Sequence, residues 1–352
     1  MRRSIFIYLF LALFIFSSKL VKTPAQTVAV SSVNVQIITD EAEAVLQILE
    51  KKEGLEEITN ADWQKVFLSE GYIRLKKREI SMQRPFEDSD FKDFVLSDNL
   101  VKRRKPLSET LVKWKEIDLD HPAELALSYL PPNAQIRAKI YPVIKPRENS
   151  FVFGIPEDPA IFLYLDPNIT KEKFENTVAH ELHHIGYGSG CQTEKTAGEI
   201  KVLSADTQKV LKWIGAFGEG FAMLAAAGGA DIHPHAVSSP DDRARWDKDL
   251  ANFNNDVETL EVFFLNLANG KLSDKEQNET ARSFYGIQGP WYTVGWQMSV
   301  VIEKTFGRAK LIECICDQRK LLPTYNKAVK KYDRQNNTHL ALWSKRLIKK
   351  LR

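Results

Sequence analysis

The sequence predicts an α+β fold that is predominantly helical and contains one small sheet near the middle of the chain. Two changes of pattern along the 352 residues support this prediction. Apolar residues recur at three- and four-residue steps from Thr39 to about Asp120, which is typical of amphipathic helices. After Pro131 the pattern changes to short β-rich runs, and helical spacing returns at Thr170 and dominates to the C-terminus.

Three segments between Pro131 and Thr170 are the predicted strands. Residues 136–143 alternate between apolar and polar side chains, which is the signature of a strand. Residues 151–154 and 160–165 are short runs rich in aromatic and β-branched residues, separated by a turn that contains two prolines. We therefore expect a small sheet directly ahead of the helix that begins near Thr170.

The first 25 residues have the pattern of a secretory signal peptide. Arg2 and Arg3 precede an uncharged apolar run, residues 5–16, and small residues follow it. This run is shorter than the ~20 residues that a membrane-spanning helix needs; an uncleaved N-terminal anchor is the alternative. We predict that residues 1–25 are removed, that no stable membrane span remains, and that the protein is secreted or located in the periplasm or cell envelope.

The rest of the chain divides by pattern into a helical N-terminal region, residues 26–130, and a region that carries the chemistry, residues 131–352. The alternative is that the two regions form one continuous domain. The formal net charge of +3 is small and evenly spread, so we expect no nucleic-acid partner.

Three cysteines are too few for a disulfide framework. One bond from Cys191 to Cys314 or to Cys316 is one hypothesis for an oxidising compartment. Buried free thiols are the other hypothesis.

Residues 180–184 read His-Glu-Leu-His-His and form an HExxH motif. With this chain's content of His and Glu, a chance match has a probability of roughly 1%. On a helix, residues four apart lie on one face, so His180 and His184 would aim their imidazoles at one metal ion. Glu181 cannot bind the same ion as its neighbours, and its place beside them suits a general base.

The surrounding residues predict the helix that this motif requires. Thr170 is the expected N-cap, and Glu172 lies in the first turn, where the helix dipole favours an acidic side chain. Gly186 and Gly188 are expected to end the helix. The predicted core stripe consists of Phe174, Val178, Leu182 and Ile185. His183 is off the line of the two ligands, and we interpret it as a core or supporting histidine.

Catalytic zinc normally has three protein ligands and one water, so a third ligand is needed. Glu219 is the preferred candidate, because mostly small residues surround it and would let its helix approach the motif helix closely. Glycines flank Glu219 on both sides, at a cost of about 1 kcal/mol each in helix propensity. Glu194 and Glu199 are the rivals, and both lie in a polar stretch.

At this point the chain resembles the gluzincin clan of metallopeptidases, since its HExxH motif is followed by a Glu-Gly-x-Ala segment at Glu219. More closely, it is similar to a largely uncharacterised bacterial family of proposed zinc-dependent peptidases. The further segments that carry this resemblance are residues 148–153, 292–295, 307–308 and 321–326. The resemblance implies a zincin-like fold for residues 131–352 and the ligand set His180, His184 and Glu219.

The predicted function is zinc-dependent hydrolysis of peptide bonds in a peptide or protein substrate. One Zn²⁺ per chain would activate a water, and Glu181 would take its proton. Tyr292 or Tyr285 is the candidate donor to the oxyanion, and a packing aromatic is the alternative interpretation of each. A strand from residues 151–153 or 160–165 is the candidate that holds the substrate backbone. A surface loop is the expected location of His233 and His235, and a place in the cleft lining or in an extended metal site is the alternative.

Two alternatives to a peptidase remain open. The first is a catalytically silent zinc-binding envelope protein that acts as a binding module. The second is a structural helical protein in which the motif is coincidental. Metal content separates the second alternative from the others, and a Glu181→Gln comparison separates the first from a peptidase.

Overall fold

The computed structural model describes residues 32–155, 157–191 and 193–351. The described residues form one compact unit. The predicted signal peptide, residues 1–25, lies outside the described residues.

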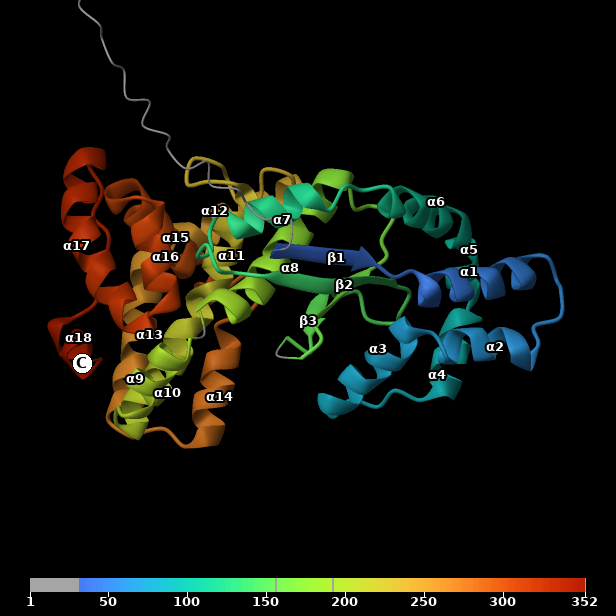
Figure 1. The fold of residues 1–352 in the computed structure, drawn as a ribbon, viewed down its shortest axis with the longest axis horizontal. Helices are drawn as coiled ribbons and strands as arrows, with labels where there is room; N and C mark the ends of the chain where they lie inside the picture. Colours follow the sequence, from blue (N-terminus) through green and yellow to red (C-terminus); the bar gives the residue numbers. More distant parts are fainter. Residues whose placement is uncertain (1–31, 156, 192, 352) are drawn as a thin grey trace, which may run out of the picture. The chain divides into compact units, whose positions relative to one another are not determined.

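The fold is α+β and predominantly helical, as the sequence predicts, with a small sheet ahead of the long central helix (Figure 1). The N-terminal elements are β1 (Val33–Ile37), α1 (Asp40–Glu53), α2 (Asn60–Phe67), α3 (Glu70–Ser81), α4 (Asp88–Val95), α5 (Asp98–Lys102), α6 (Arg104–Lys115) and α7 (Asp120–Leu127). The central elements are β2 (Ile136–Val143), β3 (Phe151–Phe153), β4 (Ala160–Tyr164) and α8 (Lys171–Cys191). The C-terminal elements are α9 (Glu194–Lys201), α10 (Ala205–Ile214), the 3-10 turn η2 (Gly215–Phe217), α11 (Gly218–Ala227), α12 (Pro240–Ala251), α13 (Phe253–Ala268), α14 (Asp274–Ser283), α15 (Pro290–Phe306), α16 (Arg308–Cys316), α17 (Gln318–Asn336) and α18 (Lys345–Lys350).

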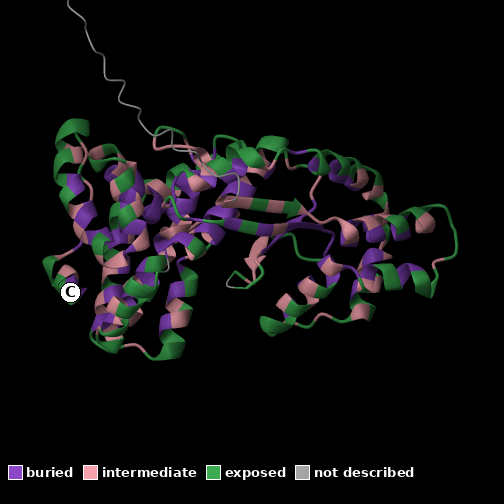
Figure 2. Ribbon diagram, viewed as in Figure 1, coloured by how far each residue is buried: buried purple, intermediate pink, exposed green. Residues whose placement is uncertain are grey.

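The sheet has four strands in the order β1-β2-β4-β3. β1 and β4 run parallel to β2, and β3 runs antiparallel to β4 at one edge. The three predicted strands, β2 to β4, are confirmed. The remaining strand, β1, was not predicted. It has five residues and is only half-buried, whereas β2 is buried over most of its length (Figure 2).

The two faces of the sheet pack against different helices, because strand side chains alternate between faces. Ile140 and Ile161 lie on the face that packs with Leu182 of α8. Tyr141 and Phe162 lie on the opposite face, where they stack at 5.1 Å and share a smaller cluster with Leu75 of α3. The sheet thus fixes one side of the helix that carries the HExxH motif.

Helix α8 begins where the sequence predicts but does not end where it predicts. Thr170 caps it, since the Thr170 hydroxyl accepts a hydrogen bond from the backbone N–H of Lys173. The helix continues through Gly186 and Gly188 to Cys191, so the expectation that these glycines end it was wrong. At Gly186 a Cβ atom would overlap the side chain of Leu130, so this glycine provides a close approach rather than a stop.

Helix α11 packs against both α8 and α15. Gly220, which follows Glu219, allows close packing of two helices as expected, but the helix that it contacts is α15 and not α8. A Cβ at Gly220 would overlap the backbone of Gly295 and Trp296, and a Cβ at Gly295 would lie 2.6 Å from the carbonyl oxygen of Phe217. The other flanking glycine, Gly218, has no atom within 4 Å of its Cβ position.

Within the described residues, one helical stretch, Ala205–Ala227, is long and apolar enough to cross a membrane. It comprises α10, η2 and α11, and its most apolar window is 67% buried inside the protein. The core helix of a soluble protein passes the same test, so this stretch alone is weak evidence for a span.

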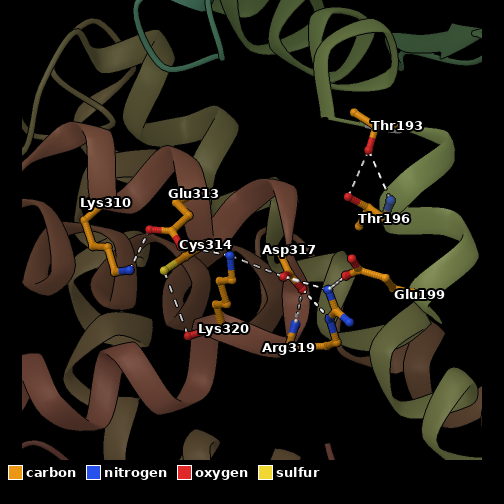
Figure 3. A network of polar contacts seen from close by, with 9 residues as sticks. All are labelled: Thr193, Thr196, Glu199, Lys310, Glu313, Cys314, Asp317, Arg319 and Lys320. Carbon is orange, nitrogen blue, oxygen red and sulfur yellow. Dashed lines mark hydrogen bonds and ion pairs between the residues drawn. The ribbon is translucent and has the colours of Figure 1, made fainter. Parts of the chain in front are cut away.

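A covalent bond and a group of ion pairs join the end of α8 and α9 to the corner between α16 and α17. Cys191 forms a disulfide with Cys316, which agrees with one of the two pairings that the sequence left open, and Cys314 is a buried free thiol. Arg319 donates to Glu199 of α9 at 2.6 Å and to Asp317 at 2.7 Å (Figure 3).

The Gly220→Ala substitution is expected to destabilise the protein by about 1–3 kcal/mol, because the added methyl group must push α11 away from α15. Gly218→Ala, two residues away in the same helix, is the matched control and should be neutral or stabilising by up to ~1 kcal/mol. Chemical denaturation of both variants measures the difference, and equal stabilities would contradict the packing role.

Candidate metal centre

The structure brings together the three side chains that the sequence proposes as metal ligands. His180 and His184 lie one turn apart on α8, and Glu219 lies in the first turn of α11. The distance between the two imidazole Nε2 atoms is 3.1 Å. Glu219 Oε2 lies 3.3 Å from His180 Nε2 and 3.3 Å from His184 Nε2. Three potential ligand atoms therefore form a nearly equilateral triangle.

This triangle has the size that a zinc ion requires. Zn–N and Zn–O bonds are about 2.0–2.1 Å long, so ligand atoms at tetrahedral angles are about 3.3 Å apart. Two imidazoles and one carboxylate are also the donor set of one class of catalytic zinc sites. The residues therefore fit the metal in chemical type and in spacing.

The electrostatics of the three ligands favour a bound cation. Although burial raises the pKa of Glu219, the adjacent His184 and His180 hold it well below its usual range, so this carboxyl is ionised. Burial lowers the pKa of His184, but the charge of Glu219 outweighs it and raises that pKa to about 9. A positive charge is thus stabilised at this point, and a metal ion would supply it in place of the proton.

Glu181 lines a cavity of about 440 Å³ together with the three ligands. Burial raises the pKa of the Glu181 carboxyl, which moves it toward the range in which a carboxylate can take and release a proton. Tyr187 lines the same cavity, one turn beyond His184 on α8. Tyr187 was not among the predicted site residues, although its helical spacing from His184 is a signal that could have identified it.

The edge strand of the sheet contributes to the wall of this cavity. Phe151 and Val152 of β3 line it, with Ser150 and Ile155 on either side. β3 is paired on one edge only, whereas β4 lies between β2 and β3 and is buried at every residue. Of the two stretches expected to hold a substrate strand, only β3 is therefore at the edge of the sheet.

The two tyrosines proposed for the oxyanion are neighbours, with ring centroids 6.5 Å apart, but they line different hollows. Tyr292 of α15 lines the cavity with Glu181, and its ring is nearly parallel to that of His180 at a centroid distance of 6.3 Å. Burial and then the charge of Glu219 raise the pKa of Tyr292, so its hydroxyl keeps its proton and can donate. Tyr285 lines a separate hollow.

Three further histidines considered in the sequence, His183, His233 and His235, lie outside the ligand cluster. His183 is 1% exposed, and burial lowers its pKa to about 3, as suits a neutral core residue. His233 contacts Asp247 at 2.9 Å, and His235 contacts Ser238 at 3.0 Å. The segment that carries these two residues was expected to be a surface loop, but His235 is 1% exposed.

The rivals of Glu219 lie elsewhere. Glu199 is paired with Arg319 in the α9 corner. Glu194 is exposed in the first turn of α9.

The fold and this cluster define a helical α+β protein with a His-His-Glu site that fits zinc. Residues 34–334 match the model of a protein family described as "Putative zinc dependent peptidase (DUF5700)". The match covers most of the chain, so the protein belongs to this family, as the resemblance noted above suggests. No curated protein and no solved structure matches the chain.

The Glu219→Gln substitution is expected to lower zinc affinity at least ~100-fold, because a neutral amide replaces the only anionic ligand of the triangle. Glu199→Gln is the matched control and should leave zinc affinity unchanged, since its partner is Arg319. Titration with zinc in the presence of a competing chelator measures both. Loss of zinc in the control, or its retention in Glu219→Gln, would overturn this ligand set.

Proposed function

We propose that this protein is a gluzincin-type zinc metallopeptidase that hydrolyses peptide bonds with Glu181 as the general base. The observation that carries the proposal is the 3.1–3.3 Å triangle of His180, His184 and Glu219, with Glu181 next to it in one cavity. Membership of a family described as zinc-dependent peptidases supports the same conclusion.

The proposed chemistry divides between the metal and the side chains around it. A zinc ion held by the triangle would lower the pKa of water and polarise the scissile carbonyl. Glu181 takes the proton of the attacking water and delivers it to the leaving amine, a task to which its raised pKa is suited. Tyr292 donates its hydroxyl proton in a hydrogen bond to the oxygen on which negative charge develops.

In this proposal the substrate backbone adds to β3 as a further strand. The free edge of β3 offers unpaired backbone groups, and it lies in the wall of the cavity that contains Glu181. An extended peptide bound there would pass its scissile bond over the ligand triangle.

We also propose that the protein acts outside the cytoplasm, secreted or in the cell envelope. Two features support this location. Residues 1–25 have the pattern of a signal peptide. The Cys191–Cys316 disulfide suits an oxidising compartment.

Glu181→Gln is expected to lower kcat for peptide hydrolysis by about 10²–10⁴-fold while zinc content stays at about one ion per chain, because the amide cannot accept the proton. Glu175→Gln, on the same helix, is the control with unchanged activity. A library of peptides, analysed by mass spectrometry, provides the substrates. Equal, near-zero activity of the parent and Glu181→Gln, both with zinc bound, would favour the silent binding module.

Tyr292→Phe is expected to lower kcat by about 10²–10³-fold with little change in KM, since the lost hydrogen bond forms mainly in the transition state. Tyr285→Phe should change kcat much less, because Tyr285 does not line the cavity that contains Glu181. Steady-state kinetics on one peptide compares the two variants. The reverse order of effects would assign the oxyanion to Tyr285.

A further inference from the structure

A second hollow, of about 310 Å³, adjoins the ligand triangle, and no residue of β3 lines it. It shares His184, Tyr187 and Glu219 with the cavity that contains Glu181, so the two hollows meet at the proposed reaction site. We call this second hollow the aromatic recess, because Tyr187, Trp213 and Tyr285 line it.

At two glycines that line the recess, an alanine side chain would not clash with any neighbouring atom. Gly215 and Gly218 adopt ordinary helical backbone angles (φ −58° and −50°), which any residue can adopt. A Cβ at either position would meet no atom within 4 Å, in contrast to Gly220, where it would overlap α15. Alanine would favour the helix more than glycine does. What the two glycines provide is open space beside the ligands.

The chemistry of the walls indicates what fills that space. Aromatic rings favour aromatic and other large apolar side chains, through burial and through stacked or edge-on contacts. The two charged side chains that line the recess already have partners: Glu219 lies within 3.3 Å of both histidines, and the Lys212 ammonium lies 4.9 Å from the centroid of the Trp213 ring. A neutral occupant therefore fits better than a charged one.

We propose that the aromatic recess receives the side chain of a substrate residue that adjoins the cleaved bond, and that Gly218 makes the enzyme prefer large aromatic or aliphatic side chains there. This inference rests on the proposed peptidase function. Gly218 acts as a specificity-determining residue through the volume that it leaves empty.

The recess can be tested by binding, without any turnover. Phenylalanine hydroxamate and alanine hydroxamate carry the same zinc-binding group and differ only in the side chain offered to the recess. Calorimetry on the zinc-loaded protein should show that the phenylalanine compound binds about 10–100-fold more tightly, which corresponds to the burial of one aromatic side chain. Equal affinities would overturn the proposal.

Gly218→Leu should abolish this difference, because the new side chain begins in the recess and occupies it. Gly198→Leu is the matched control: Gly198 lies in α9, its Cβ position is equally open, and it does not line the recess. Zinc content and circular dichroism verify that each variant is folded and loaded. Should Gly218→Leu fail to fold, Gly218→Ala serves in its place and should reduce the preference in part. A preference that persists in a folded Gly218→Leu protein would overturn the proposal.

The same proteins, incubated with a peptide library, separate this inference from the proposed function. Cleavage next to large apolar residues in the parent, shifted toward small residues in Gly218→Leu, supports both. Cleavage without any such preference refutes the recess and leaves the peptidase. Absence of cleavage, with the hydroxamate preference intact, refutes the peptidase and leaves a recess that selects side chains beside a bound metal.

Discussion

Gly220 of α11 and Gly295 of α15 lie so close that neither could carry a side chain, and much of the site depends on this contact. It holds the first turn of α11, and hence Glu219, against a helix that also carries Tyr292. The other face of α11 meets α8, which brings His180 and His184 to the same point. The packing of α11 thus places its own ligand, Glu219, beside the two histidines of α8 and beside Tyr292 of α15.

One side of α8 must be apolar to pack in the core, and the other must be polar to bind a metal ion. Its apolar residues, such as Val178 and Leu182, are fully buried in the cluster that includes the sheet. Its polar side keeps His180, Glu181 and His184 partly exposed in the cavity. A rigid, deeply packed support is what a metal site needs, since small displacements of a ligand change coordination.

Local sequence patterns were sufficient to predict the elements whose structure depends on residues that are close in sequence. The alternation in residues 136–143 and the cap at Thr170 predicted β2 and the start of α8, because strand periodicity and capping are local properties. β1 was missed because its partner strand begins about a hundred residues later, so its pairing is a tertiary contact that local patterns do not reveal. The glycines of α8 were misinterpreted because their neighbours, such as Leu130 for Gly186, are set by tertiary packing.

The candidate site also has a part that local sequence predicts and a part that only tertiary packing determines. The spacing of His180 and His184 implies a shared face of one helix, and the structure shows their Nε2 atoms 3.1 Å apart. Glu219 lies 39 residues from His180, so its position beside the histidines could be predicted only from the small residues around it. The tightly packed glycine among these residues, Gly220, contacts α15 and not α8. The aromatic recess combines α8, α10, α11 and the segment before α15, and no single stretch of sequence encodes it.

The Cys191–Cys316 bond joins residues 125 positions apart, and it therefore turns that part of the chain into a covalent ring. Glu219, Tyr292 and most of the aromatic recess belong to the ring, while His180 and His184 lie just before it on the helix to which the ring is attached. A single break in the backbone between the two cysteines would leave both fragments linked. A nick in a loop of the ring would thus keep all three metal ligands in one covalent molecule.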